Sequence, residues 1–143
     1  MHKYLNFHSN IFKIVLLFLT WRVLLILVMV FAIMFVPLGH KDRFLGGGAI
    51  NYLLSPELFS WANFDGEHYL SISIFGYKGL EQTFFPVYPM MISVLAKPVS
   101  YDFTSILVNS TIIGLIISNI SFFFSLIVLW KLVAIDFSKK IAI

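Results

Sequence analysis

The chain has 143 residues, of which 59% are hydrophobic and only 12% are charged, and its mean hydropathy is +0.92. A soluble domain has about a quarter of its residues charged, and a small one leaves too much surface in water to hide this much apolar area. The composition therefore excludes the soluble, disordered and collagen-like classes and predicts an all-α integral membrane protein. The net charge of +3 is too thinly spread for a nucleic-acid-binding patch, and the absence of Cys excludes disulfides, Cys-based zinc sites and a thiol nucleophile.

The first long apolar run covers residues 11–38 and is interrupted only by Lys13, Thr20 and Arg22. About 20 apolar residues suffice to cross the hydrocarbon core of a bilayer. A secretory signal peptide has a shorter apolar core, followed by a small-residue cleavage site. The run therefore predicts an uncleaved transmembrane helix over 11–38, preceded by a cytoplasmic N-terminus at 1–10.

Arg22 lies about 13 Å along this helix from Lys13, deep in the predicted span. A charge at that depth costs several kcal/mol unless it is paired or hydrated. Two interpretations are open: the side chain extends back toward the cytoplasm, or it faces inward and pairs with a carboxylate from another span. Neither places Arg22 in an active site on the outer face.

Two further apolar segments follow. Residues 84–97 form a short one with Pro86 and Pro89 near its start, and its apolar part covers only ~18 Å as a helix. This length predicts a re-entrant segment or a short third membrane helix, or an ordinary short helix with a kinked start. Residues 105–135 predict a second transmembrane helix, whose small polar residues suit close packing between helices.

Charge sets the expected topology. Lysines at 3 and 13 lie at the N-terminal end of the chain, and lysines at 131, 139 and 140 lie at its C-terminal end. Because positive residues favour the cytoplasmic side, the sequence predicts two crossings with both ends in the cytoplasm. Residues 39–83 are then an external loop with interfacial helices, and 136–143 are a cytoplasmic end where a longer protein is truncated.

The external loop carries four of the seven acidic residues of the chain between Glu57 and Glu81, which makes it the expected place of function. Its three glycines at 46–48 predict a flexible turn, and no Lys-Ser or Lys-Thr follows to make a phosphate-binding loop. Ser55 and Pro56 predict a helix start, with Ser55 as the cap.

The most informative helix of the loop is predicted from Asp65, as its cap, to about Phe75, with Gly76 ending it. Its spacing places Asp65, His68 and Tyr69 on one face. A neighbouring apolar stripe of Leu70, Ile74 and Tyr77 predicts that the helix lies on the membrane surface with this stripe toward lipid.

Asp65 and His68 have less specific interpretations as well. Asp65 is equally explained as a simple helix cap, and His68 as an exposed polar residue. A metal site of Asp65, Glu67 and His68 is less favoured because no second histidine is near. A Ser–His–Asp hydrolase is less favoured still, since Ser71 and Ser73 lack the context of a nucleophile elbow.

The ordered motifs of this region resemble a known family. They are Trp61 with Asp65-Gly66 and His68-Tyr69, then Gly76-Tyr77, then Phe84-Phe85-Pro86-Val87-Tyr88-Pro89. This order, after a first apolar span, is similar to the start of the GPI mannosyltransferase II (PIG-V) family and its bacterial relatives. The resemblance covers roughly residues 11–132, only the front of a domain with many more spans, and so implies the N-terminal part of a multi-span GT-C type bundle.

The resemblance implies a glycosyltransferase that moves a sugar, typically mannose, from a polyprenyl (dolichol) phosphate donor to a hydroxyl of a glycolipid or glycan acceptor. The transfer takes place at the outer or luminal face with inversion. By motif position the resemblance assigns Asp65 as the catalytic base. Donors to the substrates are expected from His68, Tyr69 and Tyr88, and Trp61 is the further candidate contact. No cofactor is implied, and no metal ligand is assigned.

Two other functions are open. The chain is alternatively a non-catalytic membrane subunit or assembly factor that binds a partner through Trp61, Phe64 and Tyr69, or part of a transporter with a helix broken at Pro86 and Pro89. The expected location is a multi-pass position in the cell membrane if the protein is bacterial, or in the endoplasmic reticulum membrane if it is eukaryotic.

Overall fold

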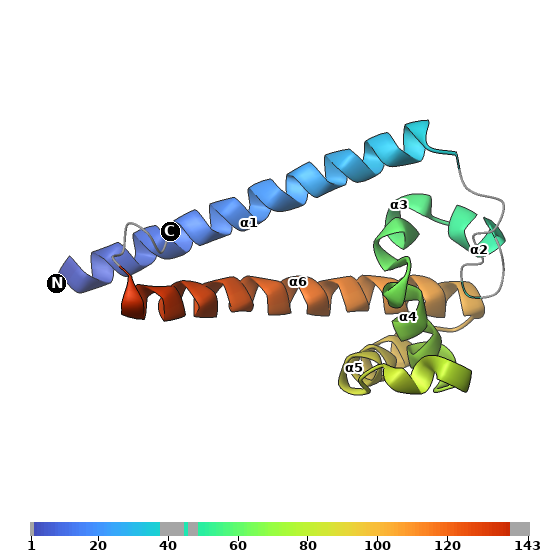
Figure 1. Ribbon diagram of the computed structural model, residues 1–143. Helices are drawn as coiled ribbons and strands as arrows, with labels where there is room; N and C mark the ends of the chain where they lie inside the picture. The colour runs from blue at the N-terminus through green and yellow to red at the C-terminus, as the bar shows by residue number, and fades with distance from the viewer. Residues whose placement is uncertain (1, 38–44, 46–48, 138–143) are drawn as a thin grey trace. The chain divides into compact units, whose positions relative to one another are not determined.

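The computed structural model describes residues 2–37, 45 and 49–137, and every regular element in this part of the chain is helical (Figure 1). Two compact units make it up: the first combines Met1–Val28 with Ser118–Ile143, and the second is Met29–Ile117. The all-helical prediction is confirmed for the described residues. The glycine turn predicted at 46–48 lies outside them.

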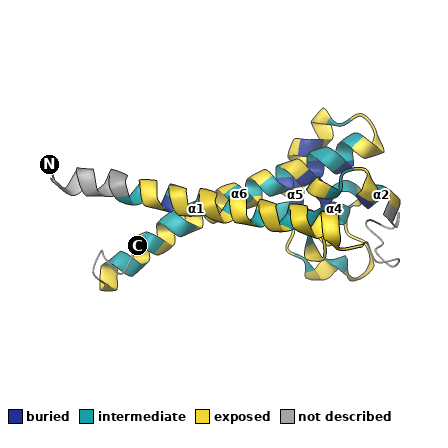
Figure 2. Cartoon of the chain, turned by 90° about the horizontal axis from the view of Figure 1, so that it is seen from above, coloured by how far each residue is buried: buried dark blue, intermediate teal, exposed yellow. Residues whose placement is uncertain are grey.

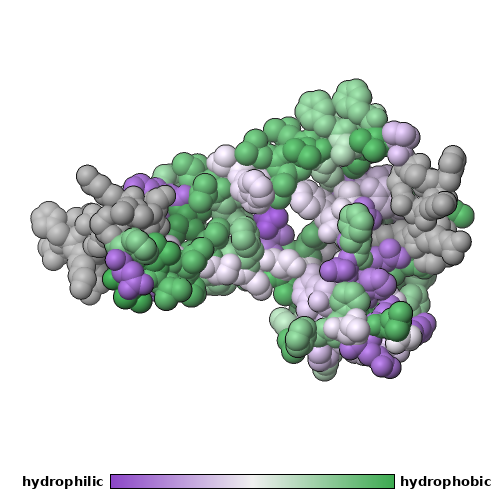
Figure 3. Space-filling model, viewed as in Figure 1, coloured by the Kyte–Doolittle hydropathy of each residue, from purple (hydrophilic) through white to green (hydrophobic). Residues whose placement is uncertain are grey.

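The two long helices are α1, His2–Phe35, and α6, Phe103–Asp136, with 34 residues each. Within them, Asn10–Phe35 and Phe103–Asp136 are long and apolar enough to cross a membrane, and only 6% of the most apolar stretch of each is buried. Apolar side chains cover most of their visible surface (Figure 3). Two helices of spanning length and composition are therefore present, as the sequence predicts.

The ends of these helices differ from the predicted 11–38 and 105–135. α1 already includes residues 2–10, and it ends at Phe35, two residues before Pro37. A proline disfavours helical geometry in the residue that precedes it, which explains an end before residue 38. α6 begins at Phe103 because Asp102 caps it: the Asp102 carboxylate accepts the Ser105 N–H at 2.6 Å, and the Ser105 hydroxyl oxygen accepts the Asp102 N–H at 2.9 Å.

The remaining elements are short. In chain order they are α2 (Ala49–Leu53), α3 (Pro56–Phe59), η2 (Ser60–Ala62), α4 (Asp65–Phe75), η3 (Gly79–Thr83), α5 (Val87–Ala96) and η4 (Lys97–Val99). Pro56 occupies the first turn of α3 as predicted, but Ser55 makes no side-chain cap bond. Its hydroxyl donates instead to the Glu57 carboxylate at 2.7 Å, which lowers the pKa of Glu57 from its usual 4.5.

Buried residues of the second unit, dark blue in Figure 2, lie on its short helices, and with Leu107 near the start of α6 they form its core. The core cluster consists of Tyr52, Phe59, Ala62, Leu70 and Leu107. Ile74 packs against it from α4. Leu70 and Ile74, predicted to face lipid, thus pack on protein, because α6 offers α4 an apolar partner that no local pattern reveals.

α5 packs closely on α6 at a glycine. The Tyr88 hydroxyl donates to the Gly114 carbonyl at 3.0 Å, and a Cβ on Gly114 would lie 3.0 Å from the Tyr88 hydroxyl and 3.1 Å from Ile92 Cδ1. Pro89 lies in the first turn of α5 and is buried, and at this position of a helix no N–H is needed for the backbone hydrogen bonds. The two prolines therefore begin an ordinary α-helix within the segment predicted at 84–97.

Candidate functional site

The start of α4 is backbone-strained. Phe64, directly before the helix, has φ 59° and ψ −122°, the geometry of the first central residue of a type II′ turn, and the Gly66 N–H donates to the Asn63 carbonyl at 3.2 Å. Glycine is the residue that suits this position, and for a bulky residue the conformation costs about 1–3 kcal/mol. Since the Phe64 side chain is 90% exposed, its own packing does not offset this cost.

Asp65, the residue that follows this turn, is the first residue of α4 rather than its cap. The cap is Phe64, and no side chain makes a cap hydrogen bond there, so the predicted capping role of Asp65 is wrong. A capping side chain belongs to the residue before the helix, from which it accepts the N–H groups of the first turn. Asp65 comes one residue later. The Asp65 side chain is exposed and accepts no hydrogen bond from the described residues. An exposed carboxylate is therefore present at this end of α4.

Glu67, two residues on, has a structural role. Its Oε1 accepts the backbone N–H of Leu45 at 2.6 Å, joining residues 22 positions apart. Leu45 packs against the core cluster and has a positive φ of 50°. Glu67 thus joins Leu45 to α4. In the part of the chain that the structure describes, no group of three or more His, Cys, Asp or Glu side chains is arranged to hold a metal ion.

His68 and Tyr69 both contact Phe84, which belongs to the sequence motif but has no predicted role. The ring of Phe84 is stacked on His68, with centroids 5.0 Å apart, and lies edge-on to Tyr69 at 5.1 Å. Tyr69 is also edge-on to Tyr88 at 5.1 Å. We call His68, Tyr69, Phe84 and Tyr88 the aromatic cluster. Three of the five predicted site residues are thus brought together.

Two tyrosine hydroxyls and one carboxylate fix this cluster. The Tyr77 hydroxyl donates to the Phe84 carbonyl at 2.9 Å, and the Tyr88 hydroxyl donates to Gly114. His68 Nδ1 lies 3.8 Å from Glu81 Oε1, an ion pair when the imidazole is protonated. Glu81 Oε2 in turn accepts the N–H of Lys78 at 3.0 Å. Half of the His68 side chain remains open to solvent, so its imidazole can still meet a ligand.

Trp61 is not part of the aromatic cluster. It lies half-buried in η2, and it makes no ring contact with other described residues. Its carbonyl oxygen is 3.9 Å from the position of a Cβ on Gly66, which places the backbone of Trp61 beside the start of α4.

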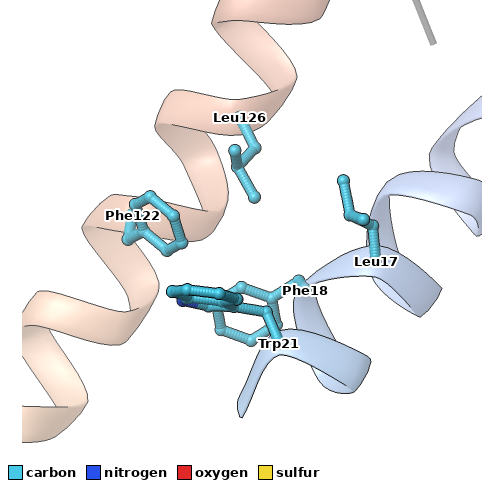
Figure 4. A pocket seen from close by; sticks show the side chains of 5 residues that line it. All are labelled: Leu17, Phe18, Trp21, Phe122 and Leu126. Atoms are coloured by element: carbon cyan, nitrogen blue, oxygen red, sulfur yellow. The ribbon is translucent and has the colours of Figure 1, made fainter. Parts of the chain in front are cut away.

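A cavity of about 230 Å³ in the first unit is lined by Leu17, Phe18, Trp21, Phe122 and Leu126, and none of the predicted site residues lines it (Figure 4). Sequence reasoning missed Glu67, Glu81 and Phe84 as the residues that hold the site. The sequence could have identified Phe84, since it lies in the same motif as Tyr88. Comparisons with family models, curated proteins and solved structures find no match to this chain.

Proposed function

We propose that the protein is a membrane glycosyltransferase of the GT-C type, anchored by α1 and α6, with Asp65 as its catalytic base. The observation that carries the proposal is the exposed carboxylate of Asp65, which follows a strained turn and has no structural bond in the described residues. The resemblance of the motifs around it to the PIG-V family gives the reaction class. The expected substrates are a polyprenyl-phosphate sugar and a hydroxyl acceptor.

The chemistry needs a base because a sugar hydroxyl is a weak nucleophile. As the acceptor oxygen attacks the anomeric carbon, the bond from this carbon to the phosphate oxygen breaks, and the hydroxyl proton passes to Asp65. The products are the inverted glycoside and the polyprenyl phosphate. Negative charge near the sugar stabilises the oxocarbenium-like transition state.

The aromatic cluster supplies groups that suit the rest of this reaction. The half-exposed imidazole of His68 offers a hydrogen-bond donor to the departing phosphate. Hydrogen bonds to phosphate are shorter and stronger than those to neutral acceptors, because the phosphate is charged. Tyr69 is one turn along α4 from Asp65, and its ring is fixed between Phe84 and Tyr88. The cluster therefore acts as a rigid wall beside the base.

The test is a matched pair of carboxylate variants in the full-length protein. Transfer of radiolabelled sugar from polyprenyl-phosphate mannose to a panel of glycolipid and glycan acceptors is measured in membranes. Asp65→Asn is expected to lower kcat by about 10²–10⁴-fold, the usual contribution of a general base. Glu67→Gln makes the same charge change two residues away and keeps an acceptor for Leu45, so it is expected to change kcat by less than about threefold. Equal effects of the two substitutions would remove Asp65 from the mechanism.

The proposed topology puts both chain ends in the cytoplasm and residues 39–83 outside. The chain contains no Cys, so single cysteines can be labelled without background. A membrane-impermeant maleimide is expected to label Tyr101→Cys, at a 90% exposed position, in intact cells. It is expected to reach Lys139→Cys only after permeabilisation, and the opposite pattern would invert the topology.

A second candidate function is a non-catalytic subunit that binds a protein partner through the proposed external loop, residues 39–83. The observation that favours it is the exposure of Phe64 at 90%, since an isolated aromatic ring at a surface is a typical anchor of an interface. Under this function Phe64→Ala abolishes recovery of the partner after cross-linking, whereas Asp65→Asn leaves recovery unchanged. Under the transferase function the Asp65 substitution has the larger effect on turnover.

A further inference from the structure

Arg22 is a cation without a counter-ion in the described part of the first unit. Its guanidinium carbon lies 5.3 Å from the ring centroid of Phe18 on α1 and 5.4 Å from that of Phe122 on α6. Its Nε is buried and has no hydrogen-bond partner among the described residues. The two rings therefore hold the guanidinium at the contact of the two long helices, but neither can accept a conventional hydrogen bond from it.

If these helices cross a membrane, the two cation–π contacts do not offset the free-energy cost of placing Arg22 in the bilayer. A cation–π contact contributes about 0.5–2 kcal/mol. Estimates for an arginine at the centre of a bilayer run from about 3 kcal/mol to more than 10 kcal/mol, and each N–H without an acceptor adds to the cost. An acceptor of opposite charge is therefore required beyond what Phe18 and Phe122 supply.

Residues 1–143 do not provide this acceptor at the right depth. None of its seven acidic residues lies in 10–35 or 103–135. Asp136, the nearest along α6, is 14 residues past Phe122 and so about 21 Å along the helix axis. A second copy of the chain has the same distribution of carboxylates, so a symmetric dimer does not solve the problem either.

Lipid headgroups are also far away. Arg22 is 12 residues from the start and 13 residues from the end of the apolar stretch Asn10–Phe35, or about 18–20 Å from each end. An arginine side chain extends over less than half of that distance, and here its guanidinium is held between two rings. To reach a headgroup, the guanidinium of Arg22 would have to leave the rings of Phe18 and Phe122.

A cavity lies beside the cation. It is about 230 Å³ in volume, all five of its lining side chains are apolar, and it shares Phe18 and Phe122 with the guanidinium contact (Figure 4). Figure 4 shows side chains from both α1 and α6 converging on it. An apolar side chain can fill this space while a carboxylate one helical turn away meets Arg22.

We propose that α1 and α6 form a docking groove for a membrane-spanning helix of another polypeptide, one that carries an Asp or Glu at mid-span and an apolar side chain one turn away. The carboxylate pairs with Arg22, and the apolar side chain fills the cavity. Charge complementarity identifies this occupant, because a fatty acyl chain can fill the cavity but cannot neutralise the cation. The proposal rests on the membrane insertion proposed above and does not depend on sugar transfer.

The test uses a synthetic apolar peptide of about 20 residues with one central Glu, and a matched peptide with Gln there. The full chain is reconstituted in phosphatidylcholine vesicles, and energy transfer between labelled chain and labelled peptide gives the dissociation constant. The Glu peptide is expected to bind at least about tenfold more tightly than the Gln peptide, a difference of about 1.4 kcal/mol.

Variants of the chain test whether Arg22 causes the preference for the Glu peptide over the Gln peptide. Arg22→Leu is expected to abolish it and Arg22→Lys to retain part of it. Lys13→Leu, which removes an exposed charge from the same helix, is expected to leave it intact. Circular dichroism verifies that each variant is equally helical.

Three results overturn the proposal: equal binding of the two peptides, a preference that survives in Arg22→Leu, or loss of the preference when phosphatidylglycerol replaces a third of the lipid. The last result would make a lipid phosphate the counter-ion. Sugar transfer measured in the same vesicles reports on Asp65 separately, so the failure of one proposal does not imply the failure of the other.

Discussion

Phe84→Leu tests whether one ring organises the candidate site. The substitution keeps an apolar side chain of similar size but removes the stack on His68 at 5.0 Å and the edge contact with Tyr69 at 5.1 Å. Aromatic pairs contribute about 0.5–1.5 kcal/mol each beyond their buried area, so the loss is expected to lower the free energy of unfolding of the second unit by about 1–3 kcal/mol. The Tyr77 hydrogen bond reaches the backbone carbonyl of Phe84 and is kept.

The neighbouring Phe85 is the matched control. Its ring is 82% exposed, so Phe85→Leu is expected to change the free energy of unfolding by less than about 0.5 kcal/mol. Denaturant unfolding in detergent is followed by the fluorescence of Trp61, in a background where Trp21 and Trp130 are replaced by Phe. If both leucine variants unfold at the same denaturant concentration, Phe84 does not organise the cluster.

Three other outcomes are expected. Phe64→Gly removes the strain of a positive φ without loss of packing, so it is expected to stabilise the second unit by about 0.5–2 kcal/mol, after the entropy cost of glycine is subtracted; a less stable variant would contradict a strained turn. Gly66→Ala places its Cβ 3.6 Å from Ala62 Cβ, which is an ordinary contact, so the free energy of unfolding is expected to rise by about 0.5–1 kcal/mol. Sugar transfer is expected to fall if the acceptor approaches the backbone of Gly66. Unchanged turnover would exclude such an approach. The Ser105 backbone N–H, and then its hydroxyl, hold the pKa of Asp102 below its usual 3.8. Because a lowered pKa stabilises the folded state above the unfolded pKa, protection of the first amides of α6 against hydrogen exchange is expected to be full above about pH 4 and to fall as pH drops through the folded pKa; Asp102→Asn is expected to remove this dependence.

The sequence predicts elements well where the determinants are local. α4 runs over Asp65–Phe75 as expected, because Gly76 has a φ of 80° that other residues rarely adopt and so ends the helix. The two long apolar helices follow from composition in the same way, and their ends shift by only a few residues on the C-terminal side of α1 and at both ends of α6.

Contacts between distant residues are what the sequence does not reveal. The bond from Leu45 to Glu67 and the packing of Leu70 on Leu107 each join segments more than 20 residues apart. An amphipathic stripe looks the same whether its partner is lipid or another helix, and for this reason the sequence alone predicts that Leu70 and Ile74 face lipid. The spacing of Asp65, His68 and Tyr69 does predict one helix face, but it does not show that Phe84 contacts both His68 and Tyr69.

The contrast between Asp65 and Glu67 is the strongest physical reason to look for function at the start of α4. Negative charge near a helix N-terminus contributes about 0.3–1 kcal/mol, and Glu67 supplies such a charge while also bonding Leu45. Asp65 adds at most a similar amount, yet the turn that leads into it holds Phe64 in a conformation costing about 1–3 kcal/mol. Local stability therefore does not account for this arrangement. A chain selected only to fold would do better with glycine at 64, so the strained turn is best explained by what it leaves exposed, a carboxylate beside a fixed aromatic cluster.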